Sequence, residues 1–413
     1  MKQLQQRIED HIEALSAFTA TPGQGTTRLT YSPQDVQARH YIKEQMTKYG
    51  LSVREDGIGN IFGRLEGTQP DAPAVLVGSH FDSVPNGGSY DGPAGVVAGL
   101  EVAALFQENQ IQPTYPLEVI AMVEEEGARF AGGLMGSRAM LGILSEQEFS
   151  ELRDKDGITT IQAMEQAGLD TSLPRIRDPR TIRAFLELHI EQGPILEEQG
   201  IPIGIVEAIV GLAQLEITVQ GQAGHAGTTP MDRRADALVA AAGIISGLPG
   251  IATETGDRSV ITTGRLNVWP NGANVIPDKV VFTVDLRSGR EEHVQTLIRR
   301  TEELAASYEQ GGIRVSVQQQ LYMKPKAMNA HIRSLLQDKS EQLGIAHCPI
   351  NSGAGHDAMV FADVTDVGML FIPSRSGLSH CPEEWSDAAD MARAVHIFYE
   401  TIRSLTTEVE GHE

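Results

Sequence analysis

Histidines and acidic residues gather where short apolar runs of this sequence end. His80 and Asp82 follow the apolar run "AVLVG", and Asp91 lies a few residues later in the glycine-rich segment "NGGSYDG". Because glycine lets a backbone turn sharply, an imidazole and a carboxylate can converge there. Both groups are ligands that zinc and manganese accept, and a carboxylate often holds the second ring nitrogen of a ligating histidine. Asp82 suits that supporting role, although a turn with ordinary hydrogen bonds also explains these residues.

A run of three acidic residues follows the apolar run "LEVIAMV". Neighbouring carboxylates at the end of a strand repel one another unless cations or protons offset their charge. Successive residues of an extended chain point in opposite directions, so Glu125 and Glu126 can do different jobs. One can hold a metal while the other stands free as a base. A solvated acidic turn is the alternative.

Two further histidines complete the set of candidate ligands. His189 lies within the apolar run "FLELHI", and His380 follows the run "GMLFIP" in a turn before Pro382. A single histidine in an apolar strand is more often a hydrogen-bonded core residue than a ligand. Three histidines and several carboxylates, all at the ends of predicted strands, indicate a shared site instead.

The overall composition narrows the classes of partner. The 413 residues include 33 Lys and Arg against 55 Asp and Glu, a formal charge of -22. That sign argues against binding to nucleic acid or to an anionic membrane and favours small-molecule partners. The two cysteines, Cys348 and Cys381, lack the spacing of a disulfide framework or a CxxC motif, which fits a reducing compartment. The sequence has neither a signal peptide nor an apolar stretch that we expect to span a membrane, so we predict a cytoplasmic protein.

The order of the predicted elements indicates an α/β domain interrupted by an insert. Ser32 and Pro33 mark the start of a helix of about four turns that ends at Gly50. Apolar strands and helices then alternate, as in a sheet covered by helices. From about Leu212 the strands alternate between polar and apolar faces, and we expect helices near Asp232–Ser246 and Glu291–Glu309. We therefore predict a catalytic domain with a mixed central sheet (residues 1–211 and 328–413) and an α+β insert (residues 212–327), with a last helix near Asp387–Ser404.

Seven segments together resemble one branch of a known family. They are "GSHFDSVPNGGSYDG", "EEEGARF", "ELHIEQGPILE", "GHAGTTPM", "NVIPDKVVFTVDLR", "SGAGHDA" and "GLSHCPEE". In this order they resemble the dinuclear aminoacylase/carboxypeptidase metallohydrolases, in the branch of allantoate amidohydrolases, N-carbamoyl-L-amino-acid hydrolases and β-ureidopropionases. The resemblance covers nearly the whole chain.

The resemblance implies two divalent metal ions, Zn2+ or Mn2+, in each subunit. Asp91 would bridge the two ions, His80 and His189 would each bind one ion or the other, and Glu126 and His380 would complete the ligand set. Glu125 would be the general base. Two neighbouring cations lower the pKa of a shared water, so that a nucleophile for an unreactive ureido carbonyl is available near neutral pH.

The resemblance also implies a role for the insert. It would be a lid and a dimerisation domain, so the protein would be a homodimer. His225 would polarise the substrate carbonyl, in the partner subunit's site, and Arg287 would grip the substrate carboxylate with its planar pair of donors. Asn274 and Gln192 resemble accessory polar contacts. His356 and its neighbour Asp357 resemble residues near the substrate.

The segments do not separate the possible substrates cleanly. "AMVEEEG", "AGTTPM", "SGAGHDA" and "FIPS" look more like allantoate amidohydrolases, which makes allantoate the leading hypothesis. An N-carbamoyl-L-amino-acid hydrolase is the alternative, because pocket differences of a methylene or two discriminate by only about 1–3 kcal/mol. A dipeptidase or aminoacylase, and a catalytically silent binding protein on the same fold, are more remote alternatives.

Overall fold

The computed structural model describes residues 2–130, 133–256 and 258–407. The chain divides into two compact units. The first consists of Met1–Glu207, Met328–Ile350 and His356–Glu413, and the second of Ala208–Ala327 and Asn351–Gly355. The second unit begins at residue 208 rather than at the expected 212, and it includes residues 351–355, which we had placed in the catalytic domain. Hydrogen bonds explain the second difference, since the carbonyls of Ser352 and Gly353 accept from Val210 N and from Arg287 at 2.9 Å.

The first unit is built on a mixed sheet, as the sequence predicted. Its strands are β1 (Ser52–Glu55), β2 (Ile61–Leu65), β3 (Ala74–His80), β4 (Leu117–Met122), β5 (Ile182–Ile190), β15 (Asp366–Ile372), and β6 (Ile203–Ile209) and β14 (His347–Ser352), whose last residues fall in the second unit. Neighbouring strands follow the order β1-β2-β4-β3-β5-β15-β6, and β14 pairs with β6. The four central strands β4, β3, β5 and β15 are parallel to one another, while β2 is antiparallel to β4.

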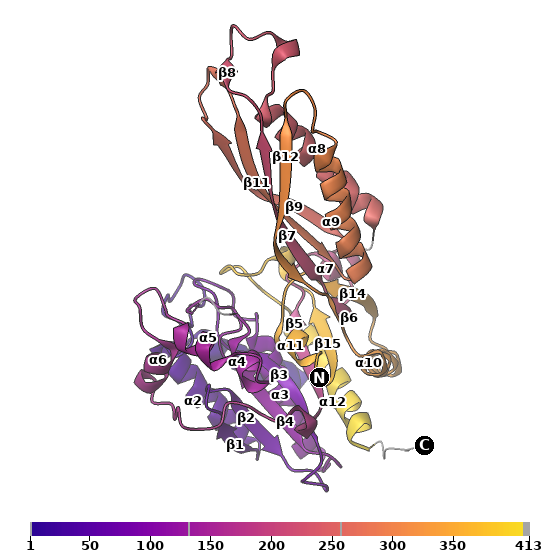
Figure 1. The fold of residues 1–413 in the computed structure, drawn as a ribbon. Coiled ribbons are helices and arrows are strands. Elements are labelled where there is room, and N and C mark those ends of the chain that lie inside the picture. Colours follow the sequence, from indigo (N-terminus) through magenta and orange to yellow (C-terminus); the bar gives the residue numbers. More distant parts are fainter. Residues whose placement is uncertain (1, 131–132, 257, 408–413) are drawn as a thin grey trace. The chain divides into compact units, whose positions relative to one another are not determined.

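Helices cover the sheet of the first unit. They are α1 (Lys2–Ser16), α2 (Pro33–Lys48), α3 (Pro93–Glu108), α4 (Met135–Met140), α5 (Glu146–Glu151), α6 (Thr160–Gln166), α7 (Ile195–Gln199), α10 (Ala330–Gln342), α11 (Asp357–Phe361) and α12 (Ala388–Thr407), with short 3-10 turns at Pro179–Thr181 and Arg375–Gly377. The predicted start of α2 is confirmed, because the Ser32 side chain accepts a hydrogen bond from Asp35 N. In Figure 1, α3 and α12 lie against the sheet near β3.

Burial of the central strands follows from this arrangement. Every residue of β3 and of β4 is buried, as expected for parallel strands covered on both faces. Since the carboxyl ends of parallel strands meet at one edge of a sheet, the residues that follow β3, β4, β5 and β15 are brought together there. The fold therefore gathers sequence-distant segments at a single edge.

The second unit is an α+β structure. Its strands are β7 (Gly211–Gln220), β8 (Gly224–His225), β9 (Val260–Trp269), β10 (Val275–Ile276), β11 (Lys279–Ser288), β12 (Arg314–Met323) and β13 (Lys326–Ala327), and it has a 3-10 turn at Met231–Arg233. An antiparallel sheet with the order β12-β7-β11-β9 carries the helices α8 (Ala237–Thr255) and α9 (Glu291–Ala306) on one face (Figure 1). Apolar residues from the two helices and from β7 and β11 form its core.

Helix α8 differs from the sequence-based expectation. We expected it near Asp232–Ser246, but it begins after the N-cap Asp236 and continues through Pro249 to Thr255. Packing overrides the proline here, because Leu248 and Ile251, on either side of it, are buried in the core of the second unit. Among the described residues, α8 is the one helix long and apolar enough to span a membrane by length and composition, which we had not expected. Its buried face packs in that core, as in a core helix of a folded domain.

Candidate metal centre

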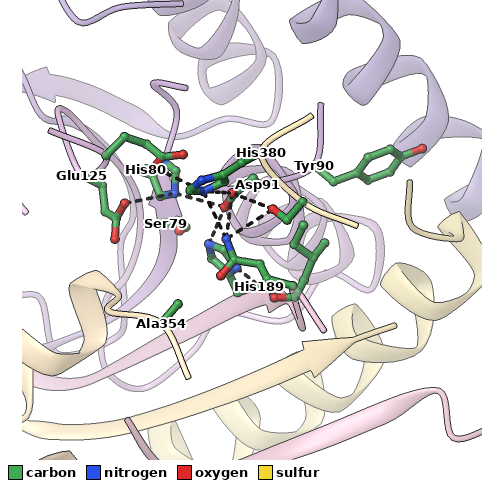
Figure 2. A network of polar contacts seen from close by, with 12 residues as sticks. Ser79, His80, Tyr90, Asp91, Glu125, His189, Ala354 and His380 are labelled. Carbon is green, nitrogen blue, oxygen red and sulfur yellow. Dashed lines mark hydrogen bonds and ion pairs between the residues drawn. The ribbon is translucent and has the colours of Figure 1, made fainter. Parts of the chain in front are cut away.

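The predicted ligands meet at the carboxyl edge of the parallel strands of the first unit. His80 is the last residue of β3, His189 is the next-to-last residue of β5, and Glu126 follows β4. His380 lies in the loop between β15 and α12, and Asp91 lies just before α3. Figure 2 shows the three imidazoles turned toward the Asp91 carboxylate. One edge of one sheet therefore assembles all five.

Two groups of ligand atoms share Asp91. His80, Asp91 and His189 form one group, and Asp91, Glu126 and His380 form the other, with the ligand atoms of each group within 4.8 Å of one another. Asp91 Oδ1 lies 3.0 Å from His189 Nε2 and 3.8 Å from His80 Nε2. Asp91 Oδ2 lies 3.0 Å from His380 Nε2, which is 3.5 Å from Glu126 Oε2. Each oxygen of one carboxylate thus faces a different group, as a bridging ligand requires.

Local contacts aim the histidines of the first group. The Nδ1–H of His80 donates to the Asp82 carbonyl at 3.2 Å, and that of His189 donates to the Ile190 carbonyl at 3.0 Å. These bonds leave Nε2 of each ring as a lone-pair donor pointing into the site. The His80 Nε2 is buried and has no hydrogen-bond partner among the residues that the structure describes. An unpaired buried nitrogen among carboxylates fits a divalent cation.

The loop that carries Asp91 must pass very close to the His80 ring. Gly92 follows Asp91 and has φ 83°. A Cβ on Gly92 would lie 2.4 Å from His80 Cε1, so any other residue would displace the ring. Glycine is therefore required at position 92, because it lets the loop of Asp91 pass beside the His80 ring.

Asp82 supports both the histidine and the acidic run. Its Oδ1 lies 3.5 Å from His80 Nδ1 and accepts Glu125 N at 3.1 Å. Its Oδ2 accepts Glu126 N at 3.3 Å. The carboxylate of Asp82 thereby fixes the turn that presents Glu125 and Glu126.

The acidic side chains are crowded and screened from water. Burial raises the pKa of Glu125 well above its ordinary value, and burial together with the charge of Asp91 raises the pKa of Glu126 to about 7. Burial alone would raise the pKa of Asp91, but the neighbouring imidazoles, His189 foremost, hold it well below its usual range. So many buried carboxyl groups need positive charge nearby, and two divalent cations would supply it.

Glu125 belongs to neither group of ligands. Its Oε2 lies 3.8 Å from His80 Nε2, and a dashed line in Figure 2 marks this contact. Its side chain is only 11% exposed. The carboxylate is therefore beside the centre, in a position where it could exchange a proton with a reacting group.

Two of the expected substrate contacts lie at the same centre. The Gln192 side-chain amide donates to Asp91 Oδ2 at 2.9 Å, while its Oε1 is buried and has no hydrogen-bond partner within the described part of the chain. The His356 ring is buried, with its centroid 4.2 Å from that of His189. Burial and the neighbouring His189 lower the pKa of His356 well below its ordinary value, so it is neutral at pH 7. Asp357, beside it, accepts a hydrogen bond from the Ser137 hydroxyl.

The other three expected contacts belong to the second unit. His225 in β8 is exposed, and its Nδ1 accepts Gly227 N at 3.0 Å. Asn274 lies next to it, since its carbonyl accepts Ala226 N. Arg287 in β11 donates to Asp285 Oδ1 at 2.7 Å. The geometry of the first unit does not include these residues, so their roles stay predictions.

Two residues near Asp91 were given no role by the sequence analysis. The Ser379 hydroxyl lies 3.1 Å from Asp91 Oδ2, and the Glu384 carboxylate accepts the backbone N–H of Asp91 at 3.0 Å. The segment "GLSHCPEE" contains both residues, but no spacing rule distinguishes Glu384 from the adjacent, exposed Glu383. Only the folded structure distinguishes the two residues, because it buries Glu384 against Asp91 and leaves Glu383 exposed.

Comparison with known proteins identifies the class to which this fold and site belong. Residues 76–404 match the model of peptidase family M20/M25/M40, and the chain belongs to that family. Enzymes of the family are dinuclear metallohydrolases. The resemblance stated from the sequence is thus confirmed.

Particular relatives narrow the class. The chain is 45% identical over 403 residues to an N-carbamoyl-L-amino-acid amidohydrolase of Paenarthrobacter aurescens, covering 97% of this chain and 98% of the relative. It is 36% identical over 402 residues to an allantoate amidohydrolase of Bacillus subtilis, covering 96% and 97%. A solved amidase of the hydantoinase/carbamoylase family from Burkholderia multivorans has a TM-score of 0.90 and 33% identity, covering 98% of each chain. The chain is a hydrolase acting on non-peptide C–N bonds.

Proposed function

We propose that this chain hydrolyses the ureido group of N-carbamoyl-L-amino acids, with ammonia, carbon dioxide and an L-amino acid as products. The observation that carries the proposal is Asp91, whose two oxygens face two separate groups of ligands. The carbamoyl-amino-acid hydrolase relative is 45% identical to this chain, whereas the allantoate hydrolase relative is 36% identical. That difference favours the alternative that the sequence analysis ranked second.

The ligand set divides between two ions. His80 and His189 would hold one ion with Asp91 Oδ1, and Glu126 and His380 would hold the other with Asp91 Oδ2. The three imidazoles and two carboxylates suit both zinc and manganese. When bound, the pair of ions supplies Lewis-acid polarisation and a water acidic enough to lose a proton near neutral pH.

Glu125 moves the proton in the proposed reaction. Its carboxylate would accept a proton from the attacking water and deliver it to the leaving nitrogen, so that one side chain acts as base and then as acid. Low exposure suits this task, because few waters compete for the proton. The leaving nitrogen departs as ammonia, and the carbamate that remains loses carbon dioxide.

The remaining predicted residues would bind the substrate. Arg287 would hold the substrate carboxylate, with Asn274 and Gln192 as further polar contacts and His356 beside the reacting group. The second unit would serve as lid and dimerisation domain, and His225 would reach the partner subunit's site to polarise the carbonyl oxygen. We propose that the protein is a homodimer. We also propose a cytoplasmic location, in keeping with the low cysteine content and the acidic composition.

Allantoate is the second candidate substrate. The segments "AMVEEEG", "AGTTPM", "SGAGHDA" and "FIPS" resemble allantoate amidohydrolases, and allantoate carries the same ureido group beside a carboxylate. Both substrates would use the same two ions and the same base. They differ in the group that must fit beside Arg287.

Ammonia release from metal-stripped protein refilled with manganese or zinc tests the proposal. We expect turnover of several N-carbamoyl-L-amino acids and little turnover of their D enantiomers, which serve as the matched control. A higher kcat/KM for allantoate would transfer the assignment to the second candidate. Turnover of a dipeptide alone would indicate a peptidase, and no turnover of any of these substrates would overturn the proposal.

A mixed dimer tests the placement of His225. The His225→Ala and Glu125→Gln variants should each be inactive alone, and we expect part of the activity to return when they are combined. In a mixed dimer, one site then has Glu125 from one subunit and His225 from the other. The control is each variant mixed with itself. Failure to complement would place His225 in its own subunit's site or outside the reaction.

A further inference from the structure

Glu384 joins the two loops that carry Asp91 and His380. Its Oε1 accepts the backbone N–H of Tyr90 at 2.9 Å and that of Asp91 at 3.0 Å. Its Oε2 accepts the Ser379 hydroxyl at 2.9 Å and the backbone N–H of His380 at 3.3 Å. One carboxylate therefore holds two segments that lie almost 300 residues apart in the chain.

Both oxygens of Glu384 are fully used. The carboxylate is buried, and its four partners are neutral N–H and O–H groups. A buried carboxylate is costly to keep unless donors satisfy it, and removal of an acceptor leaves the donors unsatisfied. The contacts are thus specific to a carboxylate, because a glutamine has only one oxygen to accept with.

The backbone opposite Glu384 leaves space for it. A Cβ on Gly88 would lie 2.0 Å from Glu384 Oε1 and 2.1 Å from its Cδ. Any residue other than glycine at position 88 would push the carboxylate out of its place. The glycine of one loop and the carboxylate of the other therefore fit as a pair.

His380 needs an external support that the other two histidines do not. His80 and His189 are buried within strands of the sheet, whereas the His380 side chain is 49% exposed in a loop. His380 also has φ 57°, which is unfavourable for a residue with a side chain and persists only when surrounding contacts fix it. Glu384 supplies such a contact at His380 N and a second one through the Ser379 hydroxyl.

We propose that Glu384 is a positioning residue for the second group of ligands, Asp91, Glu126 and His380, and that it sets the affinity of that group for its metal ion without touching the ion. The inference rests on the two-ion centre proposed above. Loss of a partner that orients a ligand typically weakens metal binding about 10- to 100-fold. The first group shares Asp91 with the second, but its two histidines have supports of their own at the carbonyls of Asp82 and Ile190. It should therefore depend on Glu384 much less than the second group does, which has both Asp91 and His380 on the loops that Glu384 joins.

Titration of the metal-free protein with Mn2+, followed by the electron paramagnetic resonance signal of the free ion, measures this directly. Wild-type protein should bind two ions per chain. In Glu384→Gln we expect the first ion to bind within about 3-fold of wild type and the second to bind about 10- to 100-fold more weakly. Gly88→Ala should have the same selective effect, because it displaces Glu384 without removing it.

Two variants act as controls. Glu383→Gln removes the neighbouring, exposed carboxylate and should leave both affinities unchanged. Glu101→Gln removes a buried carboxylate that accepts from Arg7 and Tyr49 in another part of the first unit. It should lower the melting temperature of the metal-free protein but leave both affinities unchanged.

The outcomes separate this inference from the proposed function. If wild-type protein binds fewer than two ions, the two-ion centre itself is wrong. If wild type binds two ions and Glu384→Gln binds both as tightly, the positioning role is wrong and the centre stands. Equal weakening of both ions in Glu384→Gln would also overturn the inference, because it would mean that Glu384 acts through the shared Asp91 or through folding and does not act selectively on the second group.

Discussion

The two halves of the proposed centre are built in different ways. His80 and His189 are buried at the ends of parallel strands, and their rings are held by backbone carbonyls. His380 is half exposed in a loop, at a positive φ angle, and Glu126 lies in a turn after β4. Asp91 is common to both halves. A strand-borne half with fixed ligands should bind its ion tightly, and a loop-borne half should depend on the contacts that hold its loops.

We expect the largest loss of activity when Glu125 is replaced. Because Glu125 belongs to neither group of ligands, its replacement should leave both halves of the centre intact. Glu125→Gln should lower kcat about 10²- to 10⁴-fold, as expected when a general acid and base is lost. Metal content should stay at two ions per chain, since the ligand atoms are untouched. Steady-state rates of the metal-loaded variant, with elemental analysis of the same sample, check both points. Loss of either ion in Glu125→Gln would mean that Glu125 is itself a ligand.

The next largest effect should come from the histidines that distinguish the two halves. His380→Ala should lose the weaker ion and keep the tighter one, whereas His189→Ala should lose the tighter ion and also unfold at a lower temperature, because it empties a buried position. Each change should lower activity by more than about 100-fold, which is the upper effect of losing a supporting partner. Metal stoichiometry and thermal unfolding of the metal-free proteins measure the difference. Equal behaviour of the two variants would remove the distinction between the halves.

The contrast between strand-borne and loop-borne ligands also explains which parts of the fold and the site could be predicted from the sequence. The central strands β3, β4, β5 and β15, the start of α2 and the candidate ligands were recognisable, because strand patterns and helix caps are local signals. The contacts of Glu384 were not recognisable, since its four partners lie on two loops that are distant in the sequence. The length of α8 was wrong for a related reason, because packing of Leu248 and Ile251 keeps the helix intact past Pro249. Long-range contacts decided each of these cases.

Asp82 tests whether the halves share a support. Its carboxylate is close to His80 Nδ1 and accepts the backbone N–H groups of Glu125 and Glu126, so Asp82→Asn should weaken both ions about 10- to 100-fold. Asp56→Asn is the matched control, because Asp56 is a buried carboxylate that accepts Ile58 N and Asn60 N away from the ligands. Manganese titration of both variants gives the comparison. Weakening of one ion alone would assign Asp82 to that half.

We expect the smallest change in metal affinity when Ser379 is replaced. This variant shows which contact fixes the loop of His380. Its hydroxyl lies 3.1 Å from Asp91 Oδ2 and 2.9 Å from Glu384 Oε2, but its one proton can serve only one of them at a time. Loss of one net hydrogen bond of about 0.5–1.5 kcal/mol corresponds to a weakening of about 2- to 10-fold, so Ser379→Ala should reduce the affinity for the second ion by that factor. Ser386→Ala, which removes a buried hydroxyl bonded to the Pro373 carbonyl, should leave it unchanged. A loss in Ser379→Ala as large as that expected for Glu384→Gln would mean that the hydroxyl, rather than the two backbone contacts of Glu384, fixes the loop of His380.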